Sequence, residues 1–129
     1  MELYIGGYAQ GKLDYVLSRH PSCLVFEDLD GLKSAAGKTG VKVLNHFHLI
    51  VKKMLSAGLK TEEIESEIMQ ALSCVSDLAI ICNEIGNGIV PLDKDERLYR
   101  ELTGRLMVKL AQKADKVVRI SCGLPQTLK

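Results

Sequence analysis

The chain has 129 residues, of which 47% are hydrophobic and 26% charged, and its formal net charge at pH 7 is +1. This length and apolar content predict one globular domain over residues 1–129 with a sizeable core. The small net charge gives no electrostatic reason to bind nucleic acid or an acidic membrane. The scarcity of aromatic residues, with no Trp, disfavours a protein that stacks on bases.

The apolar runs and the cysteines indicate where in the cell the protein is expected. No run reaches the roughly 20 residues that a helix needs to cross a bilayer, and a signal-peptide pattern is missing. The four cysteines, at positions 23, 74, 82 and 122, lack zinc-ligand spacing. Three of them lie in apolar, strand-like runs, where free Cys packs as a small hydrophobic side chain. We therefore expect core thiols and a reducing, cytoplasmic location.

The first part of the chain is predicted to form two strands and two helices. Residues 3–5 form a short apolar strand, and residues 12–19 form a helix that stops before a proline. Residues 23–26 form a second strand. Three glycines among small polar residues predict a loop over residues 31–40. Apolar side chains at helical spacing predict a helix over residues 41–57.

The second part continues the alternation of helices and strands. A helix is predicted over residues 61–75, a strand over residues 78–82, a long helix over about residues 93–114 and a strand over residues 117–121. The long helix carries a leucine stripe, starting at Leu98, that we expect to be buried. This alternation predicts an α/β fold with a mainly parallel sheet and flanking helices.

A glycine-rich segment follows the first strand. The sequence GGYAQGK over residues 6–12 fits G-x-x-x-x-G-K between a strand and a helix, which is the context of a phosphate loop. Backbone N–H groups would hold phosphate oxygens and the lysine would neutralise the outer phosphates. The alternative is a glycine-rich turn with a solvated lysine. The predicted nucleotide-binding residues are Gly6, Gly7, Gln10, Gly11 and Lys12.

The residue after the lysine departs from the motif. A phosphate loop has Ser or Thr there to bind Mg²⁺, whereas this chain has Leu13, which offers no oxygen. Glu27 and Asp28, at the end of an apolar strand, are candidates to hold Mg²⁺ through water. The alternative is that both belong to a polar turn. The sequence assigns no other metal ligand.

Polar residues also gather around the last strands. Asn83 and Glu84 follow the strand over residues 78–82 and are candidates to orient a nucleotide or metal, or to shape a substrate cleft. On the long helix, Arg105 is a further cleft candidate. The glycine beside it, Gly104, costs roughly 1 kcal/mol relative to Ala in a helix, so we expect another backbone to pack there.

The C-terminal part of the chain carries a long motif of small and polar residues. Its residues are Asn83, Glu84, Gly86, Gly88, Ile89, Val90, Pro91, Tyr99, Arg100, Gly104, Arg105, Ala114, Asp115, Gly123 and Lys129. With this motif the chain resembles the bifunctional adenosylcobinamide kinase / adenosylcobinamide-phosphate guanylyltransferases of cobalamin assembly. The resemblance is dense over residues 78–129, returns at residues 3–12 and is faint between. The resemblance implies a phosphate-loop NTPase-like domain that uses ATP or GTP with Mg²⁺, acts on a corrinoid and forms a homo-oligomer.

The family's guanylyl step runs through a histidine in a basic, tryptophan-containing segment that this chain lacks. We expect His20, His46 and His48 to have structural or surface roles, because His46 and His48 fall on nearly opposite sides of the predicted helix. The resemblance therefore implies a nucleotide-binding protein of cobalamin biosynthesis with impaired catalysis and no histidine–GMP adduct. The alternative is a non-catalytic binding or structural paralogue that serves as a subunit of a larger assembly.

Overall fold

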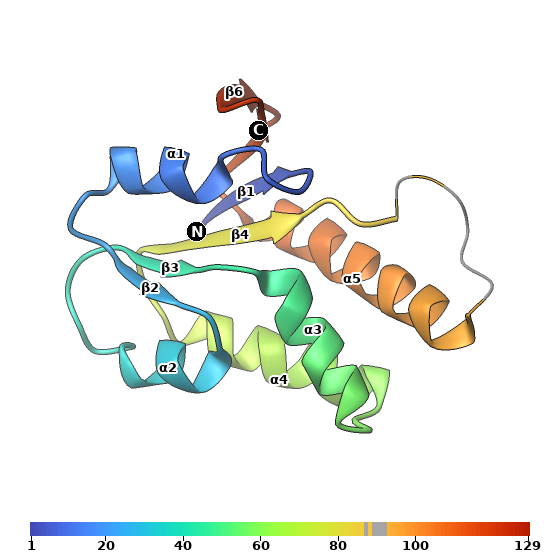
Figure 1. Ribbon diagram of the computed structural model, residues 1–129. Coiled ribbons are helices and arrows are strands. Elements are labelled where there is room, and N and C mark those ends of the chain that lie inside the picture. The colour runs from blue at the N-terminus through green and yellow to red at the C-terminus, as the bar shows by residue number, and fades with distance from the viewer. Residues whose placement is uncertain (87, 89–92) are drawn as a thin grey trace.

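The computed structural model describes residues 1–86, 88 and 93–129 (Figure 1). Predicted residues 89–91 of the C-terminal motif lie outside the described residues. The elements in chain order are β1 (Glu2–Gly6), α1 (Lys12–Arg19), β2 (Leu24–Phe26), α2 (Leu29–Ser34), β3 (Lys42–Leu44), α3 (Phe47–Ser56), α4 (Thr61–Ser73), β4 (Leu78–Asn83), α5 (Lys94–Lys113), β5 (Lys116–Ser121) and β6 (Leu124–Thr127).

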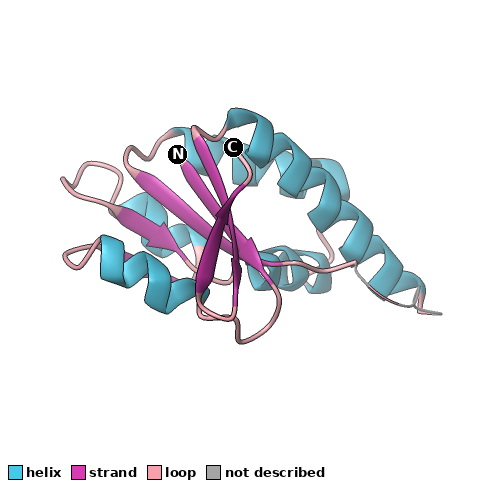
Figure 2. Ribbon diagram, turned by 90° about the horizontal axis from the view of Figure 1, so that it is seen from above, coloured by secondary structure: helices cyan, strands magenta, loops and turns pink. Residues whose placement is uncertain are grey.

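These strands form one twisted sheet in the order β2-β3-β4-β1-β5-β6, seen from above in Figure 2. The first five are parallel, and β6 returns antiparallel to β5. The α/β fold with a mainly parallel sheet and flanking helices is therefore confirmed. β1 lies between β4 and β5, and Gly6 pairs with Asn83. The glycine-rich loop thus begins at the carboxyl edge of the sheet, where ligands bind in such folds.

The two faces of the sheet carry cores of different size. Helices α2 to α5 cover one face and bury residues such as Leu32, Ile64 and Leu106 against it. The other face holds a smaller cluster around Tyr4 and Val118, to which α1 contributes Val16. Figure 1 shows α1 on the opposite side of the sheet from α2, α3 and α4. None of the helices in the described part of the chain is long and apolar enough to cross a membrane.

The prediction of a single helix over residues 41–57 is wrong. Lys42–Leu44 forms β3, paired between β2 and β4, and α3 begins only at Phe47. His46 turns the chain between them with φ of 53°, a left-handed conformation that costs roughly 1 kcal/mol in a residue with a side chain. The apolar spacing continues across this break, which explains the error.

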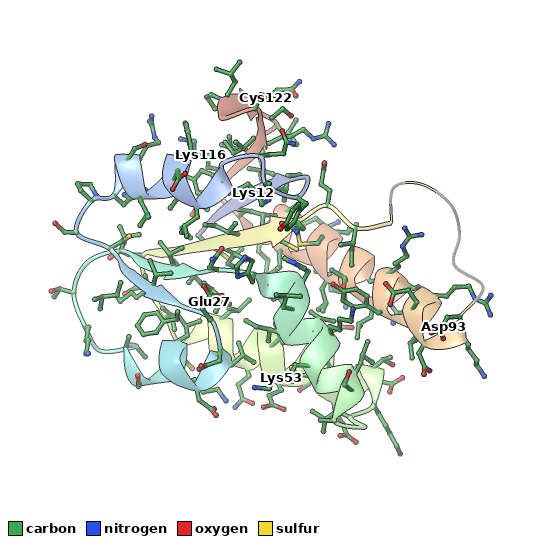
Figure 3. The ribbon with its side chains drawn as sticks, viewed as in Figure 1. Lys12, Glu27, Lys53, Asp93, Lys116 and Cys122 are labelled. Carbon is green, nitrogen blue, oxygen red and sulfur yellow. The ribbon has the colours of Figure 1, made fainter. Side chains whose placement is uncertain are left out.

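Other expectations need smaller corrections. The loop predicted over residues 31–40 begins inside α2, and β6 was not predicted. Leu98, expected in the core, is 38% exposed. Of the cysteines, Cys82 is buried as expected, whereas Cys122 is exposed at the tip of the β5–β6 hairpin (Figure 3). Cys74 is also exposed, and Cys23 is only partly covered.

Candidate functional site

The glycine-rich segment forms a loop that ends at an uncapped helix. Gly11 occupies the N-cap position of α1 with φ of 85°, and no side chain in the described part of the chain caps the helix. The first N–H groups of a helix have no partner within it, and together with the helix dipole they favour an anion. This geometry leaves the N-terminus of α1 available to phosphate oxygens.

Gln10 fastens this loop to the β5–β6 hairpin. Its Oε1 accepts a hydrogen bond from Cys122 N–H at 2.7 Å, and its backbone oxygen accepts one from Gly123 N–H at 2.8 Å. A Cβ at Gly11 would lie 3.4 Å from the Gly123 Cα, so the two glycines permit this close approach. The side chain of Gln10 therefore holds the loop in shape rather than facing a ligand with its acceptor oxygen.

Lys12 closes the loop on itself. Its side chain is only 7% exposed, and Nζ donates to the Gly7 carbonyl oxygen at 2.6 Å. Burial lowers the pKa of the ammonium group, and the nearby Cys82 and Glu84 partly oppose that shift. A desolvated ammonium group gains from meeting a phosphate, because the attraction between charges strengthens away from water.

Leu13 occupies the place of the expected hydroxyl ligand and packs against the smaller core cluster. Asp14 beside it lines the cavity in front of the loop and is exposed. The described residues contain no group of three or more His, Cys, Asp or Glu side chains that could hold a metal ion. The loop therefore lacks the hydroxyl ligand that a phosphate loop offers to Mg²⁺.

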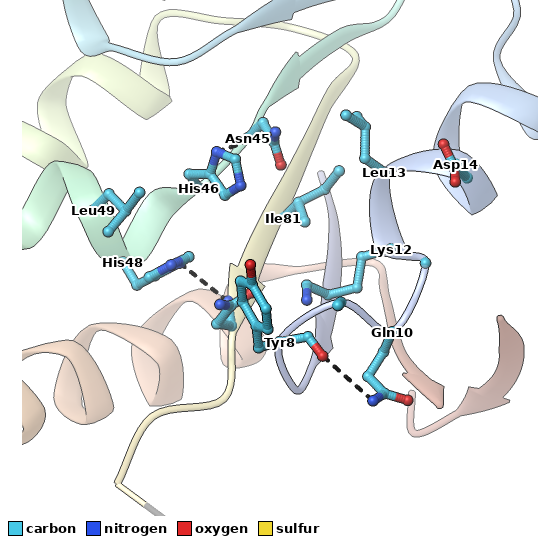
Figure 4. Close-up of a pocket in the computed structure, with 13 residues that line it drawn as sticks. Tyr8, Gln10, Lys12, Leu13, Asp14, Asn45, His46, His48, Leu49 and Ile81 are labelled. Carbon is cyan, nitrogen blue, oxygen red and sulfur yellow. Dashed lines mark hydrogen bonds between the residues drawn. The ribbon is translucent and has the colours of Figure 1, made fainter. Parts of the chain in front are cut away.

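A cavity of about 470 Å³ lies in front of the loop. Of the predicted nucleotide-binding residues, Gln10, Gly11 and Lys12 line it, together with Leu13. Figure 4 shows Lys12 and Leu13 on one side of the cavity and His46, His48 and Leu49 on the other. Asn45, Ile81 and Asn83 also line the cavity, as do Tyr8 and Ala9 of the loop.

The expectation that His46 and His48 diverge is wrong. Because β3 ends at Leu44, His46 precedes α3 and His48 lies in its first turn, so both reach the cavity. Their ring centroids are 5.8 Å apart and the rings meet edge-on at 84°. His20 stays outside the cavity, 3.5 Å from Glu2 Oε2, in line with a structural role.

Glu27 orients His46. His46 Nδ1 lies 2.8 Å from Glu27 Oε2, and Asn45 Nδ2 donates to Glu27 Oε1 at 3.0 Å. Asn45 Nδ2 is also 3.3 Å from His46 Nδ1. A hydrogen bond between these two atoms would require His46 Nδ1 to be unprotonated, because the amide nitrogen can only donate. The shorter contact with a carboxylate is the stronger one, so Nδ1 carries the proton and donates to Glu27.

His48 is held by the backbone of β4. Its Nδ1 accepts from Asn83 N–H at 3.2 Å, drawn as a dashed line in Figure 4, so the proton of the neutral ring sits on Nε2. The residue is 6% exposed, and its pKa is lowered to about 4. Burial is the main cause, followed by the electrostatic effects of His46, Lys12 and Lys52.

This lowered pKa predicts a dependence of stability on pH. The unfolded chain takes up the His48 proton near pH 6.5, whereas the folded chain takes it up near pH 4, so stability is full above pH 6.5 and falls toward pH 4. We expect a loss of about 1–2 kcal/mol, reduced from the full linkage because solvent reaches the cavity. Urea unfolding of the unmodified and His48→Gln proteins at pH 7.5 and 4.5 measures it. Equal losses in both would contradict the account.

The remaining predicted residues do not gather at this cavity, apart from Asn83. Asp28 accepts from Gly31 N–H at 2.5 Å and caps α2. Glu84 accepts from Arg119 Nε at 2.9 Å and lines a separate cavity of about 180 Å³ next to Thr103. Arg105 lies on the exposed side of α5, 3.6 Å from Glu101 Oε1. Gly104 has no described atom within 4 Å of an added Cβ, so none of the other described elements packs its backbone there.

Sequence reasoning missed the second wall of the cavity. Asn45 and His46 follow β3 at the carboxyl edge of the sheet, where polar residues have functional weight. The signal was the pair of polar residues after the apolar run Val43–Leu44, which interrupts an otherwise helical pattern. Arg119 was also missed, although a charged residue inside the β-branched run of β5 is a sign of a charged partner.

The fold is an α/β domain with a mainly parallel sheet and a glycine-rich strand–loop–helix unit at the carboxyl edge. These features place the protein in the class of phosphate-loop NTPase-like domains. The family model for cobinamide kinase / cobinamide phosphate guanyltransferase matches residues 22–128, so the chain belongs to that family. The matched range starts after the glycine-rich loop. The nucleotide-binding interpretation of residues 6–12 therefore depends on their own pattern and geometry.

Curated relatives agree with this assignment. The chain is 32% identical over 68 residues to the bifunctional adenosylcobalamin biosynthesis protein CobU of Salmonella typhimurium, covering 53% of this chain and 38% of the relative. It is 33% identical over 67 residues to the protein of the same name from Escherichia coli, covering 52% and 37%. The matches thus span less than two fifths of either relative.

Proposed function

We propose that the chain binds the phosphates of ATP or GTP at the N-terminus of α1, as a nucleotide-binding protein of cobalamin biosynthesis with impaired catalysis. The observation that carries the proposal is the strand–loop–helix unit with an uncapped helix N-terminus and the buried Lys12 beside it. Membership of the cobinamide kinase / cobinamide phosphate guanyltransferase family supports it. By the same membership, a corrinoid is the proposed second ligand.

Impaired catalysis follows from Leu13. Phosphoryl transfer depends on positioning and on neutralising charge around the transferred group, and Leu13 removes an oxygen that would help to hold a metal ion there. The same observation favours a second candidate, a paralogue that binds a nucleotide without turning it over, or that serves only as a subunit. Both candidates keep the loop, so the binding measurement comes first.

Isothermal calorimetry with ATP and with GTP tests the proposal. The unmodified protein should release or absorb heat with at least one of them, and Lys12→Ala should bind about 10–150-fold more weakly, because it loses a charge-assisted contact worth about 1.5–3 kcal/mol. Lys38→Ala, which changes an exposed lysine outside the cavity, is the matched control. No heat from folded protein with either nucleotide would refute the proposal.

We also propose that the protein is a homo-oligomer. Gly104 is open on its outer side, and exposed apolar residues lie on α5 and β6, including Val108 at 59% and Leu124 at 70% exposure. Exposed apolar side chains such as these gain free energy when a second subunit covers them. Light scattering should give a mass above that of one chain. A strictly monomeric species at high protein concentration would contradict the proposal.

A further inference from the structure

Two histidines of opposite tautomer face the cavity from the wall across from the loop. His46 donates from Nδ1 to Glu27, which leaves the lone pair of Nε2 as an acceptor. His48 accepts at Nδ1 from the backbone of Asn83, which leaves Nε2–H as a donor. The pair therefore offers one acceptor and one donor, from rings only 5.8 Å apart.

A hydroxyl group matches such a pair, because one oxygen atom both donates and accepts a hydrogen bond. A phosphate oxygen at neutral pH only accepts, so it would leave His46 Nε2 without a partner. An ammonium group only donates, and would leave His48 Nε2–H without one. With both rings neutral, the pair thus matches a neutral alcohol better than either charged group.

The position of the pair indicates which alcohol it would meet. Lys12 would contact the outer phosphates of a nucleotide bound at the loop, and the histidines line the same cavity from the other side (Figure 4). A group held between the two rings would therefore stand beyond the terminal phosphate. This is where an acceptor substrate has to place its hydroxyl group.

We infer that His46 and His48 form a subsite for the hydroxyl group of an acceptor alcohol, with Glu27 and Asn45 as positioning residues. The inference rests on the proposed function, since the family description names cobinamide and cobinamide phosphate. A kinase that converts the first into the second acts on a hydroxyl group.

The tautomers are measured directly by long-range ¹⁵N–¹H NMR of the imidazole rings, without any nucleotide or substrate. At pH 7.5, His46 should show Nδ1–H and His48 should show Nε2–H. Glu27→Gln should shift His46 toward a mixture of tautomers and leave His48 unchanged. A spectrum of the unmodified protein in which His46 carries its proton on Nε2 would overturn the subsite.

Binding is measured by calorimetry with cobinamide in the presence of a non-hydrolysable ATP analogue. His46→Ala should weaken cobinamide binding about tenfold, equal to about 1.4 kcal/mol, while the affinity for the analogue alone stays within about twofold. Cobinamide phosphate, whose hydroxyl group is blocked, should show no such dependence on His46. His20→Ala, outside the cavity, is the matched control.

The remaining outcomes of these experiments show whether the subsite or the proposed function is wrong. If the analogue does not bind, the proposed function fails, and cobinamide binding without nucleotide still tests the subsite. If His46→Ala weakens the analogue and leaves cobinamide unaffected, or if the unmodified protein does not bind cobinamide, the subsite is wrong. A GMP adduct on His46 after incubation with GTP, seen by intact mass, would also overturn it and make His46 a nucleophile.

Discussion

Phosphoryl transfer to adenosylcobinamide by the unmodified chain is expected to be very slow or undetectable, and Leu13→Ser is expected to raise any transfer. An interaction that strengthens in the transition state changes the rate about tenfold for each 1.4 kcal/mol. A serine hydroxyl at this position would add the missing oxygen near the phosphates, at the first turn of α1. It should also make nucleotide binding tighter when Mg²⁺ is present.

Leu13→Ala is the matched control for this prediction, because it removes the same apolar bulk without adding an oxygen. Calorimetry with ATP, with and without Mg²⁺, and steady-state transfer assays would be run on all three proteins. We expect a gain that depends on Mg²⁺ only in Leu13→Ser. Transfer by the unmodified chain at a rate ordinary for a kinase, roughly 1–100 per second, would show that Leu13 is no defect.

Gly6→Ala is expected to destabilise the fold by about 3 kcal/mol, at the upper end of the cost of forcing extra bulk into a packed site. A Cβ at Gly6 would lie 2.4 Å from the carbonyl oxygen of Ile120, which belongs to the backbone of the neighbouring strand β5. Gly6 also accepts a hydrogen bond from Glu84 N–H at 2.8 Å, so the strand end cannot move away freely.

Gly7→Ala is the control next to it. Beyond the chain neighbours, a Cβ added at Gly7 would have the flexible Gln10 Cγ as its nearest described atom, at an ordinary van der Waals distance of 3.6 Å. The backbone of Gly7 is not left-handed. We expect a change in the free energy of unfolding of less than about 1 kcal/mol. Urea unfolding curves of both variants measure the difference. Equal stability of the two would show that the strand end at Gly6 is not packed as the structure describes.

The sequence predicted those elements whose apolar pattern spans several turns or ends at a clear boundary residue. The helix over residues 93–114 differs from α5 by one residue at each end, since its leucine stripe spans several turns. The strands near residues 3–5 and 78–82 end at Gly6 and Asn83, which marks their boundaries. Alternation of these elements was enough to give the fold class.

The region around β3 could not be predicted in the same way. A strand of three residues is too short to show its own periodicity, and Lys42 at its start is fully buried, which is rare for lysine. Neither Gly nor Pro marks the turn, because His46 itself adopts the left-handed conformation. The helix interpretation then placed the two histidines apart, and the wall of the cavity that they form was missed.

The loop half of the candidate site was predictable because its chemistry is mostly backbone. The spacing of Gly6, Gly11 and Lys12 between a strand and a helix is itself the signal for such a loop. The fastening role of Gln10 was not predictable, because it depends on a hairpin more than a hundred residues away. The same holds for Glu84 and Arg119, which meet only when β4 and β5 flank β1.

A crystal structure of the protein soaked with ATP or GTP tests the central claim most directly. We predict phosphate oxygens at the backbone N–H groups of the loop and the first turn of α1, with Lys12 Nζ turned from the Gly7 carbonyl oxygen to a phosphate. An occupied nucleotide at another place on the molecule, with the contact between Lys12 and Gly7 intact, would contradict the claim.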